Sequence, residues 1–289
     1  MEPMDSSHSS PPSVEAMIDA VTSTFVAARR GDTDAQLAQA LVFNAGRLAW
    51  RMRSAGVDTD YKTSVSDVVT DADRAAERFV AGALAALRPD DGIVGEEGAA
   101  AASTSGRTWV IDPVDGTYNF TRGSDYWCSA VALVRGDAAD PDEVIVGAVH
   151  RPDMGYTWCG GPEHPTTCDG TPVAGPSAEP LERSAVATYL HPTKLAEAPT
   201  RDAWLAVVTQ AATLRMLGAA SVDLAGIAAG THGAWFQHSV APWDWLPGRA
   251  LVEAAGGTTA TVEAGGVTWR IAGGHACVTR IAQLLKEAQ

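Results

Sequence analysis

The spacing of apolar and polar positions divides this 289-residue chain into a helical beginning, a strand-rich middle and a mixed end. In residues 34–55, leucine and alanine recur every three to four positions, which predicts an amphipathic helix. Residues 14–30 and 71–87 have the same helical character. Short apolar runs separated by Gly, Pro and Asp then predict an antiparallel meander. These runs cover residues 129–134, 144–150 and 156–159.

Beyond residue 184, strand-like and helix-like segments alternate, which indicates an α/β fold with layers of helix and sheet. The predicted strands are 185–190, 212–216 and 234–237, and the predicted helices are 201–210, 221–229 and 242–255. A strand pair at 258–262 and 267–271, and then a helix from Ile281, are expected to close the chain.

Composition and charge exclude several classes of protein. The net charge of −14 argues against a nucleic-acid binder, which normally displays a basic face. No apolar run approaches the roughly 18 residues that span a membrane, and the four cysteines suggest no disulfide framework. Residues 1–13 are rich in Ser and Pro, which predicts a disordered tail rather than a signal peptide and favours a cytoplasmic location.

A turn after one apolar run carries the candidate chemistry. Residues 109–111 are strand-like, Pro113 should end the strand ladder, and Gly116 lets the chain turn sharply. Asp112 and Asp115 flank this turn, where carboxylates and free backbone N–H groups suit a metal ion beside a phosphate. Taken alone, the two aspartates fit equally well as turn formers and helix caps.

Other acidic side chains stand at the ends of predicted elements. Glu96 and Glu97 follow a short strand, and they should point in opposite directions, so at most one faces a shared site. Asp73 lies in the first turn of a helix that Thr70 or Asp71 would cap, a position that dipole compensation alone explains.

Three motifs in order along the chain resemble the inositol monophosphatase family. They are Gly95-Glu96-Glu97, then Asp112-Pro113-Val114-Asp115-Gly116-Thr117, and then Pro242-Trp243-Asp244 before a helix that ends in Gly-Gly. The resemblance implies an alternating αβαβα sandwich and a Mg²⁺-dependent, lithium-sensitive phosphatase, with a homodimer as the expected assembly. It covers residues 34–289, with a metal-site half at 34–180 and a substrate-side half at 181–289, and leaves 14–33 as an extra N-terminal helix.

The resemblance also implies a site with two to three Mg²⁺ ions. Glu96, Asp112 and the carbonyl of Val114 would hold one ion, Asp112, Asp115 and Asp244 a second, and a third would sit near Glu96. Gly116 and Thr117 would bind the phosphate through their N–H groups, and Asp73 with the Thr117 hydroxyl would activate the attacking water. Lys62, Asp67 and Glu97 are expected as supporting loop positions.

The resemblance also implies which residues bind the alcohol part of the substrate: Asp115 and Asp244 again, and a further group. This group comprises Arg215, Gly218, Ala219, Ala220 and Gln237. Gln237 stands where relatives that act on inositol phosphate carry a Glu, and Trp245 follows the last aspartate where a small residue is commoner.

The function expected from these residues is hydrolysis of a small polyol or sugar-like phosphate, with inositol 1-phosphate as the first candidate. Histidinol-phosphate phosphatase and fructose-1,6-bisphosphatase share the motifs and stay open. A family member that works mainly as a binding or regulatory protein is the alternative from another class.

Overall fold

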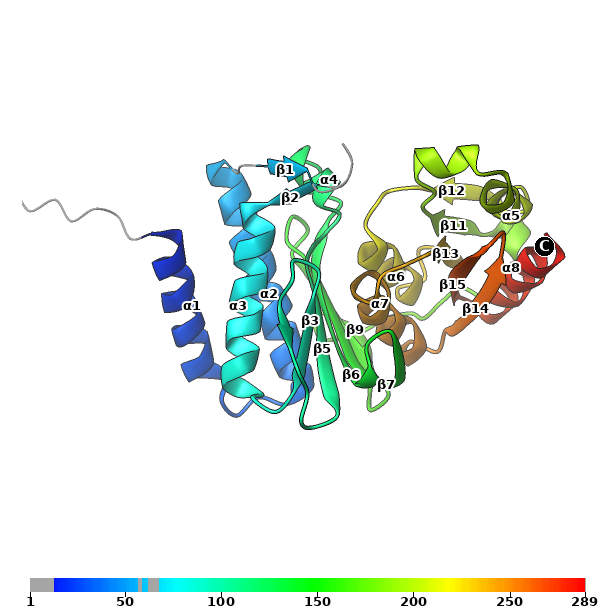
Figure 1. Cartoon of the computed structure of the whole chain (residues 1–289). Coiled ribbons are helices and arrows are strands. Elements are labelled where there is room, and N and C mark those ends of the chain that lie inside the picture. Colours follow the sequence, from blue (N-terminus) through cyan, green and yellow to red (C-terminus); the bar gives the residue numbers. More distant parts are fainter. Residues whose placement is uncertain (1–12, 57–58, 62–67, 289) are drawn as a thin grey trace, which may run out of the picture.

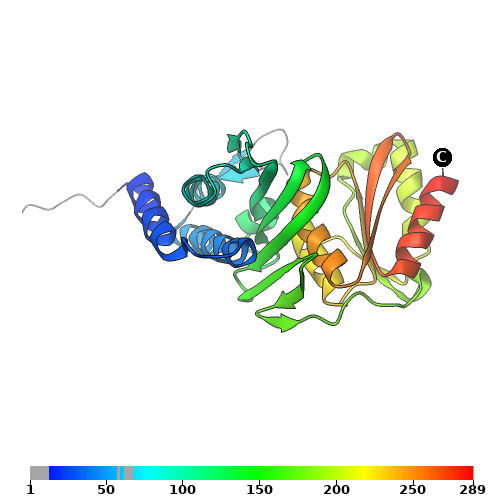
Figure 2. The same cartoon turned by 90° about the horizontal axis from the view of Figure 1, so that it is seen from below.

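The computed structural model describes residues 13–56, 59–61 and 68–288, which fold into alternating layers of helix and sheet. From one side to the other, Figure 1 shows α2 and α3, a large sheet, α6 and α7, a small sheet, and then α5 and α8. The predicted αβαβα sandwich is therefore confirmed. Figure 2 shows α1 outside this stack, beside α2 and α3.

Long helices lie on the outer side of the large sheet, where the second and third cover its face and the first packs on the third. They are α1 (Val14–Arg29), α2 (Asp34–Ala55) and α3 (Asp71–Leu87). Each has a hydroxyl side chain as its N-cap, since Ser13, Thr33 and Thr70 accept N–H groups of the first turn. The faces of α2 and α3 that bear Leu41 and Phe79 are buried in the same core.

The large sheet has eight strands in the order β10-β9-β8-β7-β6-β5-β3-β4. Its strands are β3 (Gly92–Gly95), β4 (Ala100–Ala101), β5 (Arg107–Asp115), β6 (Cys128–Asp137), β7 (Asp140–Arg151), β8 (Tyr156–Gly161), β9 (His164–Cys168) and β10 (Thr171–Pro172). Strands β6, β7 and β8 form the predicted antiparallel meander, whereas β3 and β5 are parallel. The parallel pair matters for the site, because Gly95 at the carboxyl end of β3 lies opposite Ile111, the residue before Asp112.

Two helices separate the large sheet from the small one. They are α6 (Ala220–Ala228) and α7 (Pro242–Ala254). A Cβ on Gly147 of β7 would lie 2.3 Å from the carbonyl oxygen of Pro247, so glycine lets α7 approach the sheet closely. This packing fixes the start of α7 beside the large sheet.

The small sheet has five strands in the order β12-β11-β13-β15-β14. They are β11 (Ala185–Thr188), β12 (Thr213–Arg215), β13 (Ala234–His238), β14 (Thr258–Ala264) and β15 (Val267–Gly273). Helices α5 (Ala198–Val208) and α8 (His275–Glu287) cover its outer face (Figure 1). Short elements complete the fold: β1 (Thr59–Tyr61), β2 (Val68–Thr70), α4 (Thr117–Thr121) and the 3₁₀ helices η1 (Leu181–Arg183) and η2 (Pro192–Ala196).

Two local predictions were wrong. The last helix begins at His275 rather than Ile281, because Cys277 and Val278 share its buried face with Ile281. Strand β5 does not end at Pro113: its pairing with β6 is interrupted after Asp112 and resumes where Asp115 faces Cys128. Proline removes one N–H from the ladder without ending the strand.

The structure also describes the state of the cysteines and the character of the helices. Cys128, Cys159, Cys168 and Cys277 are all free thiols. Among the described residues, none of the helices combines the length and the apolar character needed to cross a membrane.

Candidate active site

The interruption in β5 shapes the turn that carries the first two aspartates. The Ser129 hydroxyl of β6 donates to the carbonyl of Pro113 at 2.6 Å, which occupies part of the gap in the ladder. Gly116 has a φ of 90°, and a Cβ there would lie 3.1 Å from the carbonyl oxygens of both Gly218 and Tyr126. Only glycine fits this turn without displacing the backbone beside it.

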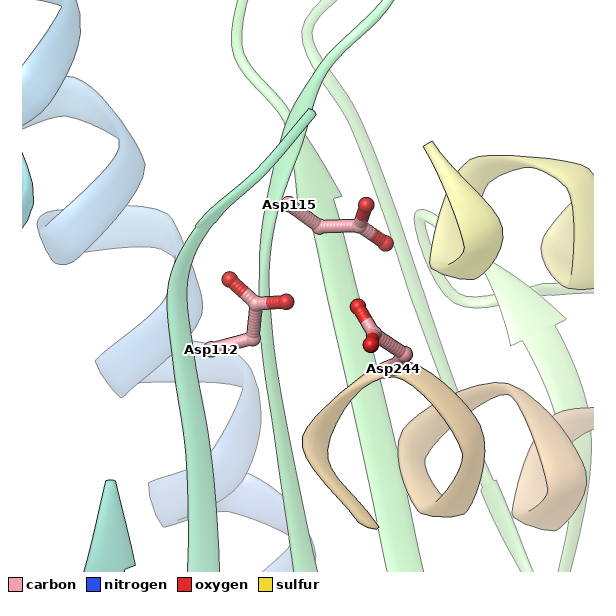
Figure 3. A group of neighbouring side chains, drawn as sticks. All are labelled: Asp112, Asp115 and Asp244. Carbon is pink, nitrogen blue, oxygen red and sulfur yellow. The ribbon is translucent and has the colours of Figure 1, made fainter. Parts of the chain in front are cut away.

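Three aspartates from distant parts of the chain meet at this turn. Asp112 and Asp115 project from β5, and Asp244 projects from the first turn of α7 (Figure 3). One carboxylate oxygen from each lies within 4.8 Å of the others. The structure therefore brings Asp244 close to the turn that carries Asp112 and Asp115.

Glu96 lines the same cavity as these aspartates. It follows β3 directly, and the register of the parallel pair sets Gly95 opposite Ile111, so Glu96 comes next to Asp112 where β3 ends. The backbone N–H of Glu97 instead donates to the Glu77 carboxylate at 2.8 Å, and Glu97 is not among the residues that line the cavity.

The acidic cluster is costly to hold with every carboxylate ionised. Burial raises the pKa of Asp112 well above its usual range, and the charges of Glu96, Asp115 and Asp244 raise it further. Burial also raises the pKa of Asp115, although the N–H groups of Ser221 and Ala220 donate to it and lower the pKa in part. A bound cation would remove this repulsion.

The oxygens of Asp112 give a test of whether a cation fits. Both are buried and have no hydrogen-bond donor within the part of the chain that the structure describes. Buried carboxylates without donors are rare, and metal coordination is one of the few ways to compensate them. The donor set consists of oxygen atoms only, which suits Mg²⁺.

A hydroxyl and a carboxylate meet on the other side of the turn. Thr117 Oγ1 lies 3.1 Å from Asp73 Oδ1 and 2.9 Å from the carbonyl oxygen of Val114. Thr70 caps α3 and donates through its N–H and hydroxyl to the other oxygen of Asp73. Burial raises the pKa of Asp73 to about 6, against the lowering effect of these hydrogen bonds. The hydrogen bonds from Thr70 therefore hold the Asp73 carboxylate with its Oδ1 oxygen next to the Thr117 hydroxyl.

A cavity of about 770 Å³ runs from the acidic cluster to the loops before η2 and α6. Its lining includes the predicted residues Glu96, Asp112, Val114, Asp115, Gly116, Thr117, Gly218, Ala219, Ala220, Gln237 and Asp244. Arg215 lies outside this lining, with its guanidinium donating to the neighbouring Thr213 hydroxyl and Leu214 carbonyl. Lys62 and Asp67 lie outside the described residues.

Glu77 is a buried carboxylate that the sequence interpretation missed. It accepts the N–H groups of Glu97 and Ala99 at 2.8 and 2.7 Å and so holds the loop that carries Glu96. Its position four residues after Asp73, on the buried face of α3, was a usable signal.

Asp223 and Tyr126 form a second polar pair that was missed. The Tyr126 hydroxyl donates to Asp223 Oδ1 at 2.6 Å, and Asp223 lines the cavity. Burial raises the pKa of Asp223 to about 7, although the bond from Tyr126 lowers it. A lone charge in the otherwise uncharged and mostly apolar helix α6 was the signal that could have identified it.

Comparison with known proteins decides the family. The sequence model of the inositol monophosphatase family matches residues 32–289. The chain belongs to the inositol monophosphatase family. It is accordingly a phosphatase, a phosphoric monoester hydrolase.

Individual proteins are similar to this chain in sequence or in fold. An inositol-1-monophosphatase from Mycobacterium leprae is 35% identical over 207 residues, 68% of this chain and 68% of that protein. A histidinol-phosphatase from Mycobacterium tuberculosis is 39% identical over 127 residues, 43% of this chain and 46% of that protein. The solved structure of the extragenic suppressor protein SuhB from Bartonella henselae has the same fold, with a TM-score of 0.75 at 23% identity over 86% of this chain and 96% of that one.

Proposed function

We propose that this chain is a Mg²⁺-dependent phosphomonoesterase that hydrolyses a small polyol or sugar-like phosphate, with inositol 1-phosphate as the first candidate. The observation that carries the proposal is the group of Asp112, Asp115 and Asp244, whose oxygens face one another beside the Asp73–Thr117 pair. Acids in this number at one end of a cavity suit bound cations, and the pair beside them suits the activation of water.

The metal ligands of the proposal divide between two neighbouring sites. Glu96, Asp112 and the Val114 carbonyl would hold one Mg²⁺, and Asp112, Asp115 and Asp244 would hold another, with a third ion near Glu96. When bound, Mg²⁺ supplies positive charge for the phosphate and for the departing alkoxide, and it lowers the pKa of bound water. Asp112 is shared, which agrees with its having two buried oxygens that lack donors among the described residues.

The chain's own contribution to the chemistry is to place water and phosphate. Thr117 Oγ1 can donate to Asp73 and accept a hydrogen bond from water, so the pair orients the water and takes up its proton. The backbone N–H groups of Gly116 and Thr117 would bind phosphate oxygens at the turn. The buried Thr70 cap keeps Asp73 in place for this role.

The identity of the alcohol rests on the part of the cavity that is lined by Gly218, Ala219, Ala220 and Gln237. The Gln237 amide can bond a substrate hydroxyl there without adding charge. Histidinol phosphate is the second candidate, supported by the 39% identity to the histidinol-phosphatase over 127 residues. Fructose 1,6-bisphosphate and a mainly regulatory role stay as alternatives, and Arg215, the homodimer and the cytoplasmic location stay predictions.

The experiment that tests this function is an assay of phosphate release from inositol 1-phosphate, histidinol phosphate and fructose 1,6-bisphosphate. We expect turnover that needs Mg²⁺ and that falls when Li⁺ is added, and kcat/KM then ranks the candidates. Failure to release phosphate from any monoester with Mg²⁺ present would overturn the enzymatic role and leave the regulatory alternative.

A further inference from the structure

Phenol and imidazole side chains line the cavity beside the acidic cluster, and the metal and water chemistry does not use them. Tyr118 belongs to α4 and comes directly after Thr117, whereas Tyr189 and His191 lie between β11 and η2. Tyr118 is 44% exposed, and Tyr189 is half-buried. A tyrosine carries an apolar ring face and a hydroxyl that donates and accepts, so both residues can contact the alcohol of a bound ester.

The small sheet places Tyr189 beside Gln237. Strands β11 and β13 are parallel and set Thr188 opposite Phe236, so Tyr189 and Gln237 follow paired residues. The next residue, Leu190, is buried in the core that the small sheet shares with α5 and α8. The segment that carries Tyr189 is therefore anchored on both sides.

Tyr118 and Tyr189 come from distant parts of the chain and lie near each other. Burial raises the pKa of Tyr189, and a negative charge on Tyr118 would raise it further. The Arg122 guanidinium lies 5.3 Å from the centroid of the Tyr118 ring, a cation–π contact that restrains this ring. The His191 ring meets the Tyr189 ring edge-on, with 6.4 Å between their centroids. Two phenol rings are thus held within one part of the cavity.

His191 adds a hydrogen-bond donor to this part of the lining. The backbone N–H of Thr193 donates to His191 Nδ1 at 3.3 Å. Because Nδ1 accepts this bond, the neutral imidazole carries its proton on Nε2. The uncharged donors and acceptors of a phenol, an imidazole and an amide match the hydroxyl groups of a polyol. The described residues that line the cavity include no Lys or Arg, so its lining suits an uncharged alcohol better than a second phosphate.

We propose that Tyr118 and Tyr189 select a ring polyol, whose C–H face packs on the phenol rings and whose hydroxyls bond the phenol oxygens. This inference rests on the proposed phosphatase function and refines its substrate class. The face of an aromatic ring carries partial negative charge and attracts C–H groups, while each hydroxyl that leaves water needs a new partner. The two tyrosines supply both contacts, beside the hydrogen bond expected from Gln237.

The test compares two monoesters that share a six-membered ring, inositol 1-phosphate and cyclohexyl phosphate, with Mg²⁺ present. We expect the lower KM for inositol 1-phosphate. The double variant Tyr118→Phe with Tyr189→Phe keeps the rings and removes the hydroxyls. Its KM for inositol 1-phosphate should rise about tenfold to a hundredfold, the effect of two lost hydrogen bonds, while kcat changes less. Its KM for cyclohexyl phosphate should rise far less, because this ester has no ring hydroxyl.

The rings are tested by Tyr118→Leu with Tyr189→Leu. Loss of the aromatic faces should raise KM for cyclohexyl phosphate about threefold to tenfold above its value in the phenylalanine variant. Tyr156 supplies the matched control, since it is 42% exposed and does not line the cavity. Tyr156→Phe and Tyr156→Leu should leave both KM values unchanged.

The outcomes separate this inference from the proposed function. An equal change in KM for both esters in the phenylalanine variant, or no change in either, overturns the inference and leaves the phosphatase function standing. A lower wild-type KM for histidinol phosphate than for inositol 1-phosphate does the same. Equal KM values for cyclohexyl phosphate in the leucine and phenylalanine variants overturn the packing of the substrate on the rings. If the wild type hydrolyses none of these esters with Mg²⁺, the phosphatase function itself fails.

Discussion

At the acidic end of the cavity the side chains stand on strands and helix starts, whereas the rim of the cavity stands on α4, on loops and at the start of η2. We use the word rim for the lining residues Tyr118, Met216, Leu217, Tyr189 and Pro192. Asp112 lies on β5 and Asp244 in the first turn of α7, and both elements are packed between layers. Met216 and Leu217 lie between β12 and α6. Packed elements hold a fixed geometry, while connecting segments vary without cost to the core. The contrast indicates that the packed elements can keep the phosphatase chemistry while substitutions in the rim change which alcohol the cavity accepts.

The largest effect is expected at the acidic end, from Asp112→Asn. Loss of a shared ligand should lower kcat at least a thousandfold, because metal ions supply several kcal/mol of transition-state stabilisation. Without Mg²⁺ the variant should melt no lower than the wild type, since one member of a repelling cluster becomes neutral. Phosphate release and thermal melting measure the two effects, with the exposed Asp142→Asn as the control. Activity near the wild-type level would contradict the metal assignment.

A smaller loss is expected from Asp73→Asn, which keeps the shape of the side chain but removes its basic group. We expect kcat to fall roughly a hundredfold to a thousandfold, the usual contribution of a general base. Asp71 lies in the same first turn, is exposed and pairs with Arg74, so Asp71→Asn controls for the helix dipole. Equal losses in the two variants would show that Asp73 acts through the helix rather than through water.

The acidic end was predictable from the sequence because its residues sit at the ends of strongly patterned elements. The apolar runs placed the end of β3 and the apolar part of β5, although β5 continues past Pro113 to Asp115. The parallel pairing sets Gly95 opposite Ile111, so Glu96 and Asp112 follow paired residues. The start of α7 was marked by Pro242, which favours the first turn of a helix. Only the motif order, however, indicated that Asp244 would reach the same point.

The rim was not predictable, because its contacts depend on how distant loops fold back. Asn119 and Leu217 are 98 positions apart, and no periodicity links them. The same holds for Tyr126 and Asp223, which are 97 positions apart. Hydrophobic patterns report which face of an element is buried, but they carry no information about which loops meet.

Glu77→Gln tests whether the hydrogen bonds that hold the Glu96 loop affect the binding of the metal. The Glu77 carboxylate accepts the N–H groups of Glu97 and Ala99, and an amide retains one accepting oxygen in place of two. The Mg²⁺ concentration for half-maximal activity should rise about tenfold, as for other groups that position metal ligands. Glu143→Gln, at an exposed pair with Arg135, should leave this concentration unchanged. If the half-maximal Mg²⁺ concentration is unchanged in both variants, the Glu96 loop keeps its position without the hydrogen bonds to Glu77.

The sheet that supports the acidic end should weaken as the pH falls. His150 on β7 is buried, and burial lowers its pKa from 6.5 to about 4. Between these values the unfolded chain takes up a proton and the folded protein does not, so His150 favours unfolding progressively more as the pH drops below 6.5. From pH 7.5 to pH 5 its contribution to the free energy of unfolding should fall by about 2 kcal/mol.

Urea unfolding at the two pH values measures this change through a comparison of variants. The stability difference between the wild type and His150→Asn should shrink by about that amount at pH 5. The difference between the wild type and His164→Asn, at an exposed site, should stay constant. A constant difference for His150→Asn would mean that the imidazole is not held neutral within the sheet.

The smallest effect is expected from Asn119→Asp, which removes hydrogen bonds between the catalytic turn and the rim of the cavity. A carboxylate cannot donate to the carbonyls of Leu217 and Tyr126, so the link between the catalytic turn and the rim should loosen. We expect KM for inositol 1-phosphate to rise about fivefold to tenfold, by the loss of one or two hydrogen bonds, with a smaller change in kcat. Steady-state kinetics with inositol 1-phosphate measures both parameters.

Asn44 supplies the matched control for this change, since its amide also donates to a backbone carbonyl, that of Ala40 at 2.8 Å, but on α2 and away from the cavity. Asn44→Asp should leave KM unaltered. If Asn119→Asp lowers kcat and leaves KM unchanged, the amide serves the catalytic turn instead of the rim. The two ends of the cavity would then be independent, and the alcohol would be selected by the loops without any link to the turn that holds the phosphate.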